Sequence, residues 1–296
     1  MSQRSGRVFA WNMSGPYEML HIYEVERILE HIPDPWRSKG FLGAWEDGGY
    51  TFLFFSSESR DLIQESLSEV GTSKVLSETV IPYEDWEAGT RLKPFEVGPL
   101  VFAPPWDAAH IQDPIIVDPG VSFGSGFHGS TRACLELLVR LYQMQKPRIV
   151  LDLGTGSGIL ALAAARLGAE MVLAVDNQPA ALEKAVENVA SNRMGENVQV
   201  RRGDVLELVE EPAHLVTANL HLDLLLELVR RPALWEKTWC IVSGLIGRQA
   251  EVFLKSLGST PMQLLESRRE GPWSAFLLYA ASQQERSQLE ACNPRA

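Results

Sequence analysis

The chain has 296 residues, of which 45% are hydrophobic and 22% charged, and this composition fits a globular protein with room for two domains. Its formal net charge of −11 argues against a protein that binds the nucleic-acid phosphate backbone, because such proteins carry a basic stripe. The negative charge serves solubility, or it attracts a cationic partner such as a lysine-rich protein.

Cysteine and histidine spacing indicates no metal site. The three cysteines are far apart and form no CxxC pair, and no HxxxH spacing lies beside a carboxylate. The first residues, "MSQRSGRVFAWNMSG", lack the apolar core of a signal peptide, and no stretch reaches the roughly 18 apolar residues of a membrane span. We therefore expect a cytoplasmic monomer with no metal, no membrane contact and no direct contact with nucleic acid.

The first 82 residues alternate short strands and helices. The predicted elements are a strand at 8–13, a helix at 17–32, strands at 41–45 and 50–55 joined by the turn "EDGG", a helix at 58–71 and a strand at 74–81. This βαββαβ order is that of a small ferredoxin-like α+β domain, which we predict for residues 1–82.

Residues 83–106 are rich in proline, tryptophan and glycine, so they cannot form a regular helix. We predict an ordered linker that packs through its aromatic side chains.

Residues 107–281 are predicted to form an α/β domain, and residues 282–296 a loose polar tail. Strand and helix alternate along "RIVLDLG", "GILALAAARLG", "MVLAVD", "PAALEKAVENVASN", "NVQVRRGD", "HLVTANL", "LDLLLELVRR" and "TWCIVSG". This alternation predicts a Rossmann-like, mostly parallel sheet with helices on both faces. Two further strands in 262–280 are expected to complete seven strands with an antiparallel end.

The stretch "VLDLGTGSGIL" predicts a cofactor-binding turn between a strand and a helix. Gly154, Gly156 and Gly158 let the backbone turn sharply and let a ligand approach without a Cβ in the way. The helix N-terminus offers free amides to that ligand. Asp176, at the end of the next strand, can accept hydrogen bonds from the two hydroxyls of a ribose.

Three features favour S-adenosylmethionine over NAD as the cofactor. The glycine spacing is GxGxG, whereas dinucleotide folds usually show GxGxxG. Asp204 in "RRGDV" is placed to read an adenine amino group, although a plain turn residue is an equal alternative. Asn219 ends the fourth strand of the alternating series, at the edge where ligands bind.

A second glycine-rich stretch, "DPGVSFGSGFHGST" at residues 118–131, precedes this turn. Together with "VLDLGTGSGILALAAARLGA", "AVDNQPAALEKAVENV", "TANLHLDLLLEL" and "SGLIGRQAEVF", it resembles the class I methyltransferases that modify large-subunit ribosomal protein eleven. The resemblance covers residues 82–280. It implies that a ferredoxin-like domain recognises the ribosomal protein and that S-adenosylmethionine is the methyl donor.

The resemblance assigns cofactor contacts to Thr131, Gly154, Asp176 and Asn219. The stretch that ends at Thr131 would be a flap over the methionine end of the cofactor, and the turn at Gly154 would hold the nucleoside. Asn219 would lie beside the methyl group and aim an amine at it.

This chain departs from the family in the flap. Phe127 replaces a threonine and Gly129 a proline in the family's "GTGTHPTT", and "NLHL", which begins at Asn219, replaces the family's "NILA". Phe127 either walls the methyl pocket or packs into the core, and His128 either relays a proton or caps the loop. His221 is expected to start the helix at 222–231. These departures leave the protein substrate open.

The resulting hypothesis is an N-methyltransferase acting on lysine or an N-terminal α-amine of ribosomal protein eleven. The alternatives are a methyltransferase for another protein and a cofactor-binding protein without transfer activity. An NAD enzyme would need GxGxxG, and a base methyltransferase would need an aromatic residue after Asn219 to stack on the base.

Overall fold

The structure, a computed structural model, describes residues 19–26, 33, 36, 39–47, 50–69, 74–82, 93–118, 120 and 128–280. The described residues up to Pro82 fall mainly in one compact unit, and those from Lys93 onward fall in the other. Among the described residues, no helix is long and apolar enough to cross a membrane.

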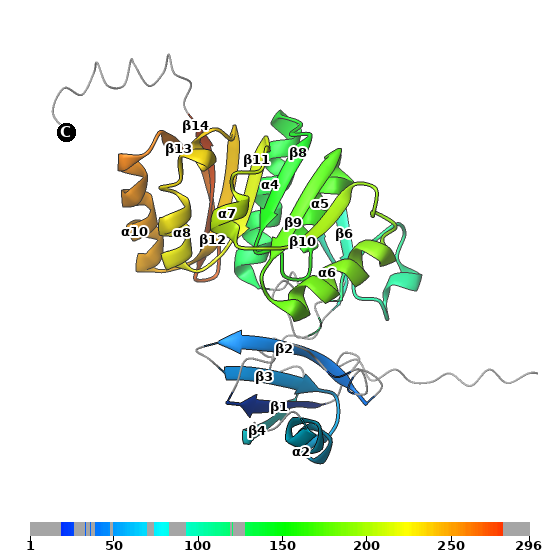
Figure 1. Cartoon of the computed structure of the whole chain (residues 1–296). Coiled ribbons are helices and arrows are strands. Elements are labelled where there is room, and N and C mark those ends of the chain that lie inside the picture. The colour runs from blue at the N-terminus through cyan, green and yellow to red at the C-terminus, as the bar shows by residue number, and fades with distance from the viewer. Residues whose placement is uncertain are drawn as a thin grey trace, which may run out of the picture. The chain divides into compact units, whose positions relative to one another are not determined.

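The first unit is built on a four-stranded sheet in the order β2-β3-β1-β4. Its described elements are β1 (Met19–Val25), β2 (Phe41–Asp47), β3 (Tyr50–Phe55), α2 (Arg60–Glu69) and β4 (Val75–Pro82). Strand β1 pairs antiparallel with both β3 and β4 (Figure 1). The order of the strands confirms the predicted ferredoxin-like sheet, and strands β2, β3 and β4 and helix α2 lie where the sequence predicts them.

The predicted helix over residues 17–32 is wrong for Met19–Val25, which is strand β1. Leu20, Tyr23 and Val25 are fully buried in the sheet. Their spacing fits a helix face, but β1 has a partner strand on each side, and Tyr23 and Val25 lie on one face of the strand by its period of two. The strand predicted at 8–13 lies outside the described residues.

The second unit contains a seven-stranded sheet in the order β10-β9-β8-β11-β12-β14-β13 (Figure 1). The strands are β8 (Ile149–Leu153), β9 (Met171–Asp176), β10 (Val198–Arg202), β11 (Leu215–Asn219), β12 (Trp239–Ile246), β13 (Met262–Glu270) and β14 (Trp273–Ala280). Strands β8 to β12 are parallel, and β14 runs antiparallel between β12 and β13. The predicted parallel-rich sheet with an antiparallel end is therefore confirmed.

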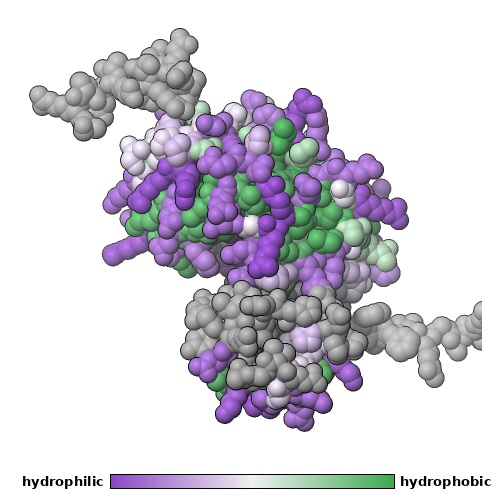
Figure 2. Space-filling view, viewed as in Figure 1, coloured by the Kyte–Doolittle hydropathy of each residue, from purple (hydrophilic) through white to green (hydrophobic). Residues whose placement is uncertain are grey.

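Helices cover both faces of this sheet and enclose two apolar cores. They are α4 (Gly129–Met144), α5 (Ile159–Leu167), α6 (Pro179–Ser191), α7 (Val205–Leu208), α8 (Leu222–Leu228), α9 (Pro232–Trp235) and α10 (Arg248–Ser256), with short 3₁₀ turns at Ala108–His110 and Leu257–Ser259. Helices α4 and α5 pack on one core, and α8 and α10 on the other. Hydrophobic residues show between the hydrophilic outer sides of the helices in Figure 2, as expected of amphipathic helices on a buried sheet.

The described part of the expected linker, residues 93–106, lies within the second unit. Strands β5 (Phe95–Val97) and β6 (Leu100–Ala103) form a hairpin, and β6 also pairs with β7 (Ile115–Ile116). The rings of Phe95 and Phe102 stack at 4.9 Å, and Phe102 is buried in the core beside α4. The aromatic side chains of this stretch therefore anchor a small third sheet.

Candidate functional site

The glycine turn joins β8 to α5 at the carboxyl edge of the sheet. Gly154, Gly156 and Gly158 have φ angles of 73°, 55° and 84°, in the left-handed region that glycine adopts without strain. A Cβ at Gly154 would also overlap Cδ2 of Leu220, the residue after Asn219. The left-handed backbone of the turn therefore favours glycine at position 154, and the Leu220 side chain would have to move to admit a Cβ there.

Asp176 ends β9 next to this turn, as the sequence predicts. Its Oδ2 accepts a hydrogen bond from the amide of Gly156 at 3.0 Å, and its Oδ1 accepts one from the amide of Gln178 at 3.0 Å. Burial raises the pKa of Asp176 above its ordinary value, and these backbone amides oppose that rise. Each carboxylate oxygen keeps a second lone pair, so the side chain can still accept from two hydroxyls.

Asn219 meets the end of the first glycine-rich stretch. Its Nδ2 donates to Ser130 Oγ at 3.0 Å and to Thr131 Oγ1 at 3.3 Å, and both of these hydroxyl residues are buried. The structure thus brings together Asn219 and Thr131, which are 88 residues apart in the sequence. No described residue donates a hydrogen bond to the amide oxygen of Asn219, which faces away from the two hydroxyls because the amide is planar.

The last three residues of the expected flap loop, Gly129–Thr131, form the first turn of helix α4. His128 occupies the N-cap position without a side-chain capping bond, and its Nδ1 lies 2.6 Å from Ser130 Oγ. Burial lowers the pKa of His128 and so favours the neutral imidazole. Phe127 lies outside the described residues.

Asp204 and His221 both lie at N-cap positions of helices. Asp204 caps α7 by accepting a hydrogen bond from the amide of Leu206 at 2.8 Å, which is the alternative of a local turn residue. A contact between Asp204 and adenine stays a prediction. His221 precedes α8, as expected, without a side-chain capping bond.

The sequence analysis missed a buried carboxylate beneath the site. Asp152 on β8 is 1% exposed, and it accepts hydrogen bonds from Thr155 Oγ1 and Thr217 Oγ1, each at 2.6 Å. Burial raises its pKa to about 6, although the two hydroxyl donors oppose this. An aspartate inside an otherwise apolar strand, "VLDL", is the signal that could have identified it.

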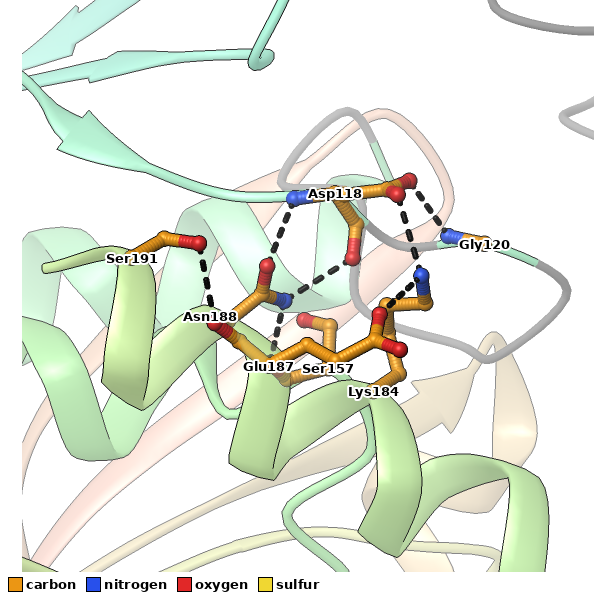
Figure 3. A network of polar contacts seen from close by, with 7 residues as sticks. All are labelled: Asp118, Gly120, Ser157, Lys184, Glu187, Asn188 and Ser191. Carbon is orange, nitrogen blue, oxygen red and sulfur yellow. Dashed lines mark hydrogen bonds and ion pairs between the residues drawn. The ribbon is translucent and has the colours of Figure 1, made fainter.

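The sequence analysis also missed the contact that joins the two glycine-rich stretches, which is made by helix α6 (Figure 3). Asn188 is 2% exposed, and its Nδ2 donates to the carbonyl oxygens of Asp118 and Ser157, each at 2.8 Å. Its Oδ1 accepts from the amide of Asp118 at 3.0 Å. One side chain therefore fixes the start of the first stretch against the glycine turn of the second.

Lys184 reinforces this junction one turn earlier on α6. Its Nζ lies 3.0 Å from Asp118 Oδ2 and 2.7 Å from Glu187 Oε2, while Asp118 Oδ1 accepts from the amide of Gly120 at 2.9 Å (Figure 3). Burial lowers the pKa of Lys184, but the two carboxylates outweigh it and raise the pKa above its ordinary value. Asp118 is thereby held through both its backbone and its carboxylate.

Two other features of the second unit lie outside this arrangement. A cavity of about 590 Å³ is lined by Phe95, Asp113 and Arg166 among others, and none of the described site residues lines it. No group of three or more histidine, cysteine, aspartate or glutamate side chains among the described residues is placed to hold a metal ion.

Comparison with known proteins identifies the family. The sequence profile of the ribosomal protein L11 methyltransferase (PrmA) family matches residues 53–280. The chain belongs to this family. The predicted resemblance is therefore confirmed, and it extends into the first unit.

Relatives in the family cover most of the chain. A ribosomal protein L11 methyltransferase of Clostridium perfringens (strain ATCC 13124) is 32% identical over 258 residues, which is 84% of this chain and 81% of the relative. One of Pelotomaculum thermopropionicum is 37% identical over 214 residues, 70% of this chain and 69% of the relative. The crystal structure of a ribosomal protein L11 methylase from Lactobacillus delbrueckii subsp. bulgaricus superposes with a TM-score of 0.56 at 27% identity, covering 64% of this chain and 100% of that one.

Replacing Asp152 by asparagine should change how stability depends on pH. The folded carboxyl has a pKa of about 6 against an ordinary value of 3.8, so the folded state binds the proton more tightly. Wild-type stability therefore contains a contribution that is full below about pH 4 and is lost as pH rises through 6. We expect the variant to gain about 1–3 kcal/mol relative to wild type between pH 4 and pH 7, measured by urea unfolding. A constant difference over this range would contradict the assignment.

Replacing Asn188 by alanine should weaken cofactor binding as well as stability. The change removes three hydrogen bonds and leaves the Ser157 carbonyl in the glycine turn without this donor, so we expect a loss of about 1–3 kcal/mol in unfolding free energy. We expect at least fivefold weaker S-adenosylmethionine binding in calorimetry. Asn197→Ala is the control, because the Asn197 side chain donates to the Glu170 carbonyl at the opposite edge of the sheet. Equal affinity in both variants would show that Asn188 does not position the turn.

Proposed function

We propose that the chain is an S-adenosylmethionine-dependent N-methyltransferase that modifies lysine, an N-terminal α-amine, or both, on ribosomal protein L11. The observation that carries this proposal is the placement of the Asn219 amide. It lies between the hydroxyls of Ser130 and Thr131, at the sheet edge that also carries the glycine turn and Asp176. Membership of the L11 methyltransferase family supports the same assignment.

The residues at this edge fit S-adenosylmethionine. Gly154 and Gly156 keep Cβ atoms out of the turn that leads into α5, and Asp176 has acceptor capacity for the two ribose hydroxyls. Thr131 and Asn219 would lie toward the methionine end, and Asp204 toward the adenine. When bound, the cofactor supplies an electrophilic methyl group on a sulfonium.

The acceptor amine must arrive with a free lone pair. A lysine side chain has an ordinary pKa of about 10.4, so deprotonation at pH 7 costs roughly 4–5 kcal/mol. Burial of the amine beside a cation would reduce that cost, because both effects disfavour the ammonium form. The transfer forms a nitrogen–carbon bond, breaks the carbon–sulfur bond, and leaves one proton for the solvent or a base to take.

Asn219 can orient that amine without adding a charge. Its Nδ2 is held by Ser130 and Thr131, so its Oδ1 is presented in a fixed direction and can accept an N–H bond from the amine. Nδ1 of His128 contacts Ser130 Oγ, and a proton relay through His128 stays a prediction. We further propose that the first unit binds the ribosomal protein and that the reaction takes place in the cytoplasm.

The test is to incubate the protein with labelled S-adenosylmethionine and recombinant L11 from the same organism, and to locate the label by mass spectrometry. We expect label on lysine or the α-amine, and at least a hundredfold lower rate in Asn219→Ala, because the amine loses its orienting acceptor. The control is Asn197→Ala, the same substitution at the opposite edge of the sheet, which should keep the wild-type rate.

Tight cofactor binding without label on L11 would assign the chemistry to another protein substrate or to a binder without transfer. Absence of cofactor binding would overturn the proposal as a whole.

A further inference from the structure

The turn between β13 and β14 lies at the same edge of the sheet as Asn219. In the strand register Asn219 is opposite Ser243 of β12, and Trp273 is opposite Ile246, three residues further toward the carboxyl end of β12. Because β14 is antiparallel to β12, it begins at this edge, and Trp273 is its first residue. The hairpin therefore presents an indole ring beside the site.

Trp273 packs directly on the N-terminus of α4. Its ring centroid lies 4.3 Å from that of His128, at an interplanar angle of 52°. A Cβ added at Gly129 would lie 2.8 Å from Cδ1 of Trp273 and 2.7 Å from the carbonyl oxygen of Glu270. Position 129 consequently has no room for a side chain unless the hairpin moves, and the contact with His128 is close.

A chain of hydrogen bonds runs from His128 to Asn219. Ser130 Oγ accepts from Asn219 Nδ2 at 3.0 Å, so its own proton is available for His128 Nδ1 at 2.6 Å. We assign the Ser130 proton to this bond, which places the proton of the neutral imidazole on Nε2. Rotation of the imidazole would break its bond to Ser130 and leave the Ser130 hydroxyl, one of the two groups that orient the amide of Asn219, free to turn.

We propose that Trp273 is a positioning residue for methyl transfer, which fixes the His128 ring and, through Ser130, the amide plane of Asn219. The inference rests on the proposed function of this site. It assigns a role in the site to the antiparallel end of the sheet.

The decisive variant is Trp273→Leu, with Trp273→Phe as the conservative one. We expect the leucine variant to lower kcat about tenfold while the dissociation constant for S-adenosylmethionine changes less than about twofold, because the cofactor is held mainly by the glycine turn and Asp176. The phenylalanine variant should retain most of kcat because it keeps a flat ring against His128. Trp239→Leu is the matched control, since Trp239 lies at the opposite end of β12 and packs near Tyr279.

A measurement on the cofactor-free protein separates this inference from the proposed function. The side-chain amide resonances of Asn219, assigned by their absence in Asn219→Asp, should shift in Trp273→Leu and stay in place in Trp239→Leu. Unchanged resonances in Trp273→Leu would overturn the inference even if kcat falls. If the wild type transfers no methyl group to L11, the proposed function fails and the resonances alone decide the role of Trp273.

A double-mutant cycle with Ser130→Ala distinguishes positioning from simple packing. Because Ser130 links His128 to Asn219, adding Trp273→Leu to Ser130→Ala should lower kcat no further. Additive losses would show that Trp273 acts by another route and would overturn the inference. If Trp273→Leu does not fold, Trp273→Met, whose flexible side chain fills the same space, replaces it in every comparison.

Discussion

The buried carboxylate of Asp152 ties together the two strands on which the candidate site depends. It accepts hydrogen bonds from Thr155, in the glycine turn after β8, and from Thr217, two residues before Asn219 on β11. Since β8 and β11 are adjacent and parallel, these bonds fix the turn relative to Asn219. Burial opposes the charged form, and a buried charge is weak evidence for stability. We therefore interpret Asp152 as a residue that fixes the positions of two chain segments. These segments leave neighbouring strands and must present their groups to one small ligand.

The parallel part of the sheet could be predicted from the sequence because its inner strands are largely apolar and bounded by glycine, proline or polar residues. In "MVLAVD" a continuous apolar run ends at an acid, and in "IVLDLG" a run interrupted only by Asp152 ends at a glycine, and the strands end there too. The first unit was harder. Residues 17–32 have apolar positions that fit a helix, yet Met19–Val25 is the central strand, because pairing with β3 and β4 outweighs local periodicity.

The site residues at the edge of the sheet could be predicted where they belong to a sequence motif. The contacts between these residues could not be predicted. Asp176 and Asn219 follow from their places at strand ends. The contacts of Asn188 depend on how α6 packs against two distant stretches, and the periodicity of "EKAVENVASN" gives only the face on which Asn188 lies. The sequence predicts Gly129–Thr131 as the end of a loop, whereas these residues begin α4. Tertiary packing explains the difference, since the first turn of this helix lies against the β13–β14 hairpin.

The antiparallel end of the sheet changes what the carboxyl edge can carry. A parallel strand beside β12 would begin at the opposite edge, so its first side chains would be remote from Asn219. Because β14 runs the other way, the hairpin turn and Trp273 come to the edge where β11 ends, and they reach the N-terminus of α4. Helix α4 is thus held at its first turn by contacts from two directions, the hydroxyls of Ser130 and Thr131 on Asn219 and the indole on His128. An amide held in this way can orient an incoming amine with little further loss of side-chain freedom, which is the condition that positioning without acid–base chemistry requires.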